Sequence, residues 1–115
     1  MAGTIREMIT EKSELLRHIE QLGPHKAAEE LVELCSLLSS LKKHVVDQNY
    51  WYNIKRQELL REHTKAAQAK IHAEASAEWR NWQEAKAQEE ALEELIRSVK
   101  YYLRSASDEL REFTR

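Results

Sequence analysis

The chain has 115 residues, which is enough for one domain with a core of useful size. Two glycines and one proline stand against many Ala, Glu, Leu, Lys, Arg and Gln residues. This composition favours helices and excludes a β-rich fold, which needs turn residues. Charged residues make up 33% of the chain, but the formal net charge is −2, which excludes general coating of DNA by excess positive charge.

The cysteine content and the apolar runs bear on where the protein works. Cys35 is the single cysteine, so no internal disulfide can form and the chain suits a reducing cytoplasm. No apolar run reaches the length of a signal-peptide core or the roughly 18 residues of a membrane span. We therefore expect a cytoplasmic protein with no membrane partner. Cys35 follows Leu34 in an apolar stripe, and we expect its thiol in the core.

The first predicted helix covers residues 4–22. Thr4 stands three residues before Glu7, the spacing at which the two side chains can satisfy free backbone donors at a helix start. Apolar residues then recur at steps of three and four on one side, which predicts a face that needs a partner. Gly23 can adopt the left-handed conformation that ends a helix, and Pro24 suits the first turn of the next one.

From His25 onward no residue stops a helix decisively. A single rod of about ninety residues would span on the order of 135 Å, too long for one domain of this mass. We therefore predict a long helix over about 25–62, a reversal near His63 to Ala69, a second long helix over about 68–104, and a short C-terminal helix over 107–114 that Ser107 and Asp108 cap.

These elements predict an all-α fold: a long helical hairpin or antiparallel coiled-coil bundle, with the short N-terminal helix packed alongside, in a single helical domain over 1–115. Small residues at Ala66, Ala69, Ala73 and Ala77 would let two backbones approach closely. Alternating charges along the helices fit a multi-chain coiled coil as easily as a monomeric hairpin. We expect a homo-oligomer, with the number of chains left open.

Groups that would carry catalysis or bind a metal do not stand at the required spacings. A carboxylate-bridged metal site in a helical bundle needs Glu-x-x-His pairs, but leucine or alanine stands three residues before every histidine. The histidines and Cys35 also lack zinc spacing, and the chain has no glycine-rich loop and no nucleophile elbow. The sequence therefore predicts a protein that is not an enzyme, with no catalytic, metal or cofactor residues.

Aromatic residues beside basic ones are the most informative local pattern, because such pairs anchor helices, protein partners or single-stranded nucleic acid. The balanced net charge favours packing or protein contact over nucleic acid, and Trp79 and Trp82 share a face as core residues do. Arg97, Lys100, Arg104 and Arg111 form a positive edge, for which a solvated face is the alternative. The predicted partner-binding residues are Trp51, Tyr52, Trp79, Trp82, Arg97, Lys100, Tyr101, Tyr102 and Arg104.

Residues Glu74 to Glu109 read EASAEWRNWQEAKAQEEALEELIRSVKYYLRSASDE. This stretch, under a third of the chain, resembles small all-helical accessory proteins of tailed bacteriophages and prophages. Those proteins combine an alanine-rich, aromatic-centred helix with a run like Ile96-Arg97-Ser98-Val99-Lys100, and their genes often lie near recombination genes. The resemblance implies a phage origin and an accessory role, and it carries over no catalytic residues. The predicted helix from Thr4 to Leu22 lies outside the pattern.

The leading hypothesis is a non-enzymatic, phage-type helical adaptor in the cytoplasm of a bacterial host. It would bind a protein or nucleoprotein complex in DNA recombination, replication or host takeover. One alternative is an inhibitor of a bacterial defence nuclease, similar to an anti-CRISPR protein, in which acidic rows such as Glu29-Glu30 and Glu33 stand in for phosphate. The other is an oligomer that binds single-stranded nucleic acid directly.

Overall fold

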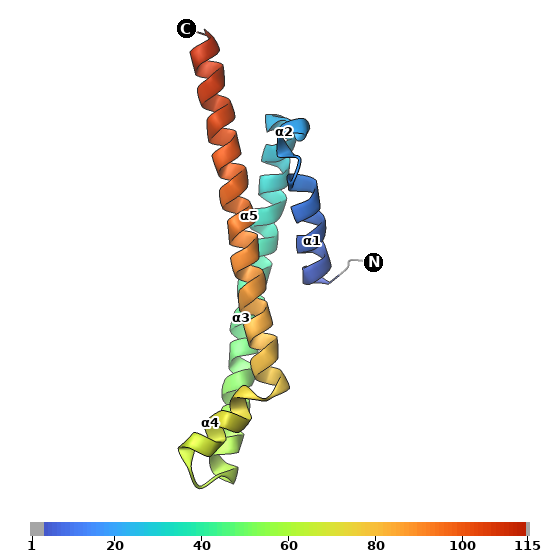
Figure 1. Cartoon of the computed structure of the whole chain (residues 1–115). Helices are drawn as coiled ribbons and strands as arrows, with labels where there is room; N and C mark the ends of the chain where they lie inside the picture. Colours follow the sequence, from blue (N-terminus) through green and yellow to red (C-terminus); the bar gives the residue numbers. More distant parts are fainter. Residues whose placement is uncertain (1–3, 115) are drawn as a thin grey trace. The chain divides into compact units, whose positions relative to one another are not determined.

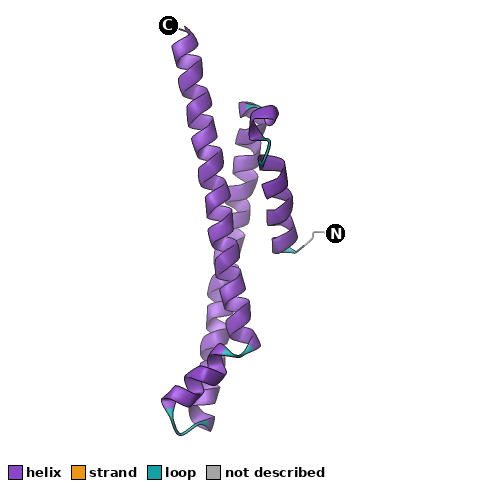
Figure 2. Cartoon of the chain, viewed as in Figure 1, coloured by secondary structure: helices purple, strands orange, loops and turns teal. Residues whose placement is uncertain are grey.

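The computed structural model describes residues 4–114, and every regular element in that range is a helix (Figures 1 and 2). The predicted all-α class is therefore confirmed, as are the two long helices and the short N-terminal one. No helix among these residues is both long and apolar enough to cross a membrane. In chain order the helices are α1 (Ile5–Leu16), α2 (Ile19–Leu22), α3 (Pro24–Glu62), α4 (Ala66–Glu74) and α5 (Ala77–Thr114).

The described residues fall into two compact units. The terminal unit holds those up to Ser39 together with those from Glu90 onward, and the turn unit is Ser40–Glu89. The turn unit is one continuous stretch of chain and the terminal unit consists of two, and the boundary between the units falls within both α3 and α5. The prediction of a single domain over 1–115 stays a prediction.

The start of the chain differs in one respect from the single helix predicted over 4–22. The Thr4 hydroxyl accepts a hydrogen bond from the Glu7 N–H at 3.2 Å, so the predicted cap at the helix start is confirmed. The helix is then interrupted after Leu16, because His18 leaves the helical region (φ −115°, ψ 43°), and a four-residue α2 follows. Neither Gly nor Pro marks this break, so residue type alone does not reveal it.

The turn between α2 and α3 is the one position among residues 4–114 where the backbone requires glycine. Gly23 has φ +83°, where a side chain would strain the backbone, although the space around its Cα is open. Pro24 then begins α3, whose first turn needs no donor from that residue. The predicted break at this point is confirmed.

The reversal from α3 to α5 uses a short helix in place of one simple turn. After Glu62 the chain leaves the helix at His63, forms α4, leaves it again at Ala75, and enters α5 at Ala77. The Ser76 hydroxyl donates to the Ala73 carbonyl (2.6 Å) and accepts from the Trp79 N–H (3.2 Å), which caps the start of α5. The predicted start of the second long helix near residue 68 is therefore wrong.

The C-terminal end of α5 also departs from the prediction. The prediction of a separate short helix over 107–114 is wrong, because α5 continues through Ser105 and Ser107 to Thr114 without a break. Serine lowers helix propensity only slightly, and extending an existing helix is far easier than starting a new one. Without glycine or proline, the helix does not end there.

The core of the terminal unit lies where α1, α3 and α5 meet, and Figure 1 shows α1 alongside α3. Its buried apolar side chains come from all three helices, and fully burying one the size of leucine contributes about 1.5–3 kcal/mol. They are Ile9 and Leu16 on α1, Ala27 and Leu34 on α3, and Leu92, Ile96 and Val99 on α5.

One charged contact attaches α1 to α3 beside this core. The Lys12 ammonium donates to the Glu30 carboxylate at 2.6 Å and also to Glu33. Glu30 is only 4% exposed, so removing Lys12 would leave a buried carboxylate without its counter-charge, which is costly.

The hydrogen bond and charge of Lys12 lower the pKa of Glu33. Burial lowers the pKa of Lys12, but the hydrogen bonds and charges of Glu30 and Glu33 outweigh it and raise that pKa overall.

We predict that α1 loosens in acid. Because the pKa of Glu33 is lowered in the folded chain, its contribution to stability is present above its ordinary value of 4.5 and is lost as the pH falls through the folded value. The raised pKa of Lys12 has the opposite sense, so its contribution is lost only above pH 10.5. Amide hydrogen-exchange protection in Ile5–Leu16 should be constant from about pH 6 to 8 and should fall below about pH 4.5.

The matched variant is Lys12→Met, which keeps much of the stem and removes the charge. Its α1 protection should be low already at pH 7 and should not fall further in acid. Lys26→Met is the control, because Lys26 pairs with the exposed Glu29 at 3.5 Å and acts on Glu33 through its charge alone. Equal acid loosening of α1 in wild type and Lys12→Met would contradict the role given to Lys12.

Candidate functional site

The predicted partner-binding residues divide between the two units and between buried and exposed positions. In the turn unit, Tyr52 is buried, and Trp79 and Trp82 pack against the core that it forms with Leu59, Ala69 and Ala73. The rings of Tyr52 and Trp82 stack with centroids 5.1 Å apart and planes 24° apart, and Lys86 Nζ lies 3.9 Å from the centroid of the Trp82 ring. These three aromatic residues therefore serve packing.

The alanines of α4 make this packing possible. Ala69 and Ala73 are completely buried against Tyr52 and Leu59, where larger side chains would hold the helices apart. The sequence pattern of small residues at this point predicted the close approach. It did not reveal that Tyr52, on α3, would be the residue that Trp82 meets.

A second set of turn-unit residues faces outward from α3. Tyr50 and Trp51 are 58% and 54% exposed, and their rings meet edge to face with centroids 5.3 Å apart. Residues at steps of three, four and seven place further exposed side chains on the Tyr50 side of the helix, opposite the buried Tyr52 and Leu59. We call this set the α3 ridge, and its residues are Lys43, Val46, Tyr50, Gln57 and Arg61.

In the terminal unit, Tyr101 is 72% exposed, more than any other aromatic residue among the predicted partner-binding residues. Arg97 lies four residues before it and Arg104 three residues after it, so both flank it on the outer side of α5, and Lys100 is also exposed. Arg97 is bonded to Glu94. We call Arg97, Lys100, Tyr101 and Arg104 the Tyr101 face.

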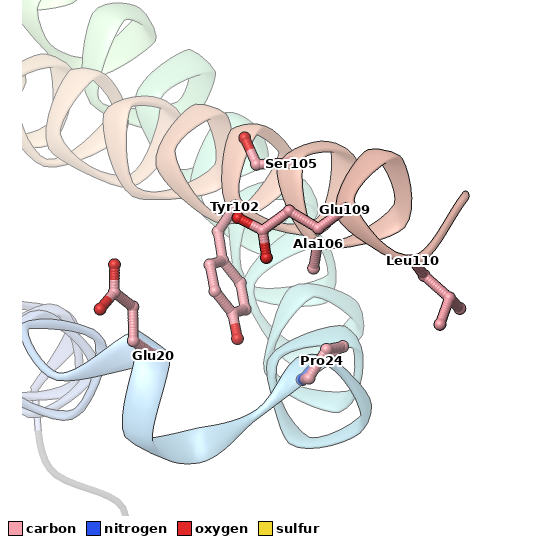
Figure 3. Close-up of a pocket in the computed structure, with 7 residues that line it drawn as sticks. All are labelled: Glu20, Pro24, Tyr102, Ser105, Ala106, Glu109 and Leu110. Carbon is pink, nitrogen blue, oxygen red and sulfur yellow. The ribbon is translucent and has the colours of Figure 1, made fainter. Parts of the chain in front are cut away.

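Tyr102 lies on the neighbouring side of α5 and lines an open cleft of about 610 Å³ within the terminal unit (Figure 3). Figure 3 shows Tyr102 projecting from α5 toward the segment that carries Glu20 and Pro24. Further along α5 the cleft is lined by Ala106, Glu109 and Leu110, among others. Its walls therefore combine apolar surface with the hydroxyl groups of Tyr102 and Ser105 and with the carboxylates of Glu20 and Glu109.

Cys35 is exposed, so the prediction of a core thiol is wrong. Successive residues on a helix point about 100° apart, and it is Leu34 that faces the core, with no exposed surface. A position next to an apolar stripe is not by itself a position within it.

The described residues hold no group of three or more His, Cys, Asp or Glu side chains that could bind a metal ion. His63 and His72 do lie together at the end of α3, with parallel rings 4.5 Å apart. Comparison with family models, with curated proteins and with solved structures found no match for this chain.

We predict that Trp82→Ala and Trp51→Ala differ sharply in their effect on stability. Trp82→Ala removes a ring packed on the core and should lower the free energy of unfolding by about 2–4 kcal/mol. Trp51→Ala truncates a side chain that faces solvent and should change it by about 0.5 kcal/mol or less. Urea unfolding followed by circular dichroism measures both, and equal losses would contradict the packing described for the turn unit.

Proposed function

We propose that this chain is a non-enzymatic helical adaptor that binds a protein or nucleoprotein partner through the Tyr101 face. The supporting observation is a tyrosine that is 72% exposed between two arginines, on the side of α5 opposite the fully buried Val99. A helix needs no aromatic residue on its solvent side for folding. A tyrosine held there gains its stabilisation only when another molecule covers it.

The residue types suit recognition. Tyrosine and arginine are among the residues most enriched at the positions that dominate binding energy at interfaces. The guanidinium group binds carboxylate or phosphate in two parallel hydrogen bonds, and exposed positive charges speed encounter with an acidic partner. Lys100 adds a third positive charge to the same face.

Protein is favoured over bare nucleic acid as the direct contact. Glu94 and Asp108 lie close to Tyr101 on α5, and both would repel phosphates. Single-strand binding also uses several stacking platforms in a row, whereas the Tyr101 face offers one. A nucleoprotein complex would then be engaged mainly through its protein component.

The resemblance of residues 74–109 to phage-encoded helical proteins supports the setting of this proposal. It suggests a bacterial host cytoplasm, and a partner that acts in DNA recombination, replication or host takeover. The Tyr101 face lies within that stretch, as does the Ile96-Arg97-Ser98-Val99-Lys100 run.

Two variants test the proposal by their effect on partner capture. Tyr101→Ala removes the aromatic contact and Arg104→Glu reverses a flanking charge, and each should weaken partner binding at least about tenfold, which corresponds to roughly 1.4 kcal/mol. Tagged proteins expressed in bacteria would be purified, and the co-purifying proteins quantified by mass spectrometry. At least one protein should be enriched with wild type and depleted with both variants.

The matched control is Trp51→Ala, which removes another exposed aromatic residue from the turn unit and should retain the same protein. Circular dichroism should show unchanged helix content in all three variants. Recovery of no specific protein, or equal recovery with Tyr101→Ala and wild type, would contradict the proposal.

A further inference from the structure

The cleft exists because the inner apolar stripe of α5 continues beyond the part that the other helices cover. Leu92 and Leu110 are 18 residues apart, five full turns, so they lie on the same side of α5. Leu92 has no exposed surface, whereas Leu110 is 65% exposed. Val99 is still fully buried and Ala106 only partly, so cover is lost progressively toward the end of the helix.

The side chains around the cleft define what could cover it. Pro24, Ala106 and Leu110 offer apolar surface, Tyr102 offers one face of a ring, and Glu20 and Glu109 place a carboxylate on each side (Figure 3). A complementary surface must therefore be convex and apolar, with positive charge beside the apolar residues. The same cleft of a second copy does not meet this requirement, because it would bring four carboxylates together.

The α3 ridge does meet it. Val46 and Tyr50 are 66% and 58% exposed and lie one turn apart on the convex outer side of α3. Lys43 stands at one end of the ridge and Arg61 at the other, and both are exposed. None of the other helices of the turn unit covers this side of α3.

The net charges of the two units are also opposite in sign. Residues 40–89, the turn unit, contain nine Lys or Arg and seven Asp or Glu, a net charge of +2. The rest of the chain contains nine Lys or Arg and thirteen Asp or Glu, a net charge of −4. Opposite net charges attract two copies in the orientation that brings unlike units together.

We propose that the cleft of one copy binds the α3 ridge of a second copy. Val46 and Tyr50 cover Leu110 and Ala106, and the positive charges of Lys43 and Arg61 at the two ends of the ridge attract the carboxylates of Glu20 and Glu109. Since each chain carries one cleft and one ridge, every copy has both halves of the contact. The Tyr101 face takes no part, so this inference stands or falls independently of the proposed function.

Charge exchange tests the contact directly. Glu20→Lys/Glu109→Lys makes the cleft positive, and Lys43→Glu/Arg61→Glu makes the ridge negative, so each double variant alone should associate at least tenfold more weakly than wild type. In an equimolar mixture, every contact between one variant and the other again joins opposite charges, so association should recover. The mass in solution would be measured by sedimentation over a range of protein concentrations, with circular dichroism to confirm unchanged helix content.

The control is Glu11→Lys/Glu84→Lys, which changes the net charge as much as the cleft variant but at exposed positions outside the cleft and the ridge. It should associate as wild type does. The contact is supported if the wild-type chain assembles with rising concentration, into pairs or into longer chains, and if this assembly weakens in both double variants and returns in their mixture. A wild-type chain that stays monomeric, association untouched by the double variants, or a mixture that does not recover would each overturn it.

Discussion

Buried apolar residues recur every seven positions along both long helices. They are Ala27, Leu34 and Leu41 on α3 and Ala85, Leu92 and Val99 on α5. Seven-residue spacing keeps an apolar stripe on one side of a long helix, so two such helices can bury their stripes against each other along their length. The other features depend on this burial. Lys12 holds α1 beside it in the terminal unit, and the aromatic stack of Tyr52 and Trp82 extends it in the turn unit.

A hairpin of two long helices buries one side of each and leaves the other side in solvent. In a larger bundle those outer sides would be covered, but here they carry Tyr101 on α5 and Tyr50 with Val46 on α3. The end of α5 adds an inner surface that also lacks cover, at Leu110. Apolar and aromatic groups in these places contribute nothing to the fold of one chain. Their presence is the observation on which the proposed binding function rests.

Much of the fold could be predicted from the sequence, because it depends on residues with strong local preferences. Gly23 and Pro24 mark their turn by backbone geometry, and the apolar spacing marks the long helices. The break at His18 and the reversal through α4 depend on how helices pack, which residue type does not encode. The Ser76 cap was predictable in principle, because a serine precedes Glu78 at a helix start, but the neighbouring alanines concealed it. Among the predicted site residues, the sequence pattern could not separate the exposed Trp51 from Trp82, which packs against the core. The sequence analysis also overlooked Leu110, although its spacing of 18 residues from Leu92 places both on the same side of α5.

The central claim is that one apolar stripe of α5 is covered within the chain at Val99 and uncovered at Leu110. Thiol labelling measures this directly, with Val99→Cys and Leu110→Cys each made in a Cys35→Ser background and compared at concentrations low enough to keep copies apart. The account predicts that a thiol at position 110 reacts nearly as fast as it does in the unfolded chain. A thiol at position 99 should react only when the helix pair opens, and therefore at least a hundredfold more slowly. An opening free energy of about 3 kcal/mol produces a ratio of this size. Similar rates at the two positions would contradict it.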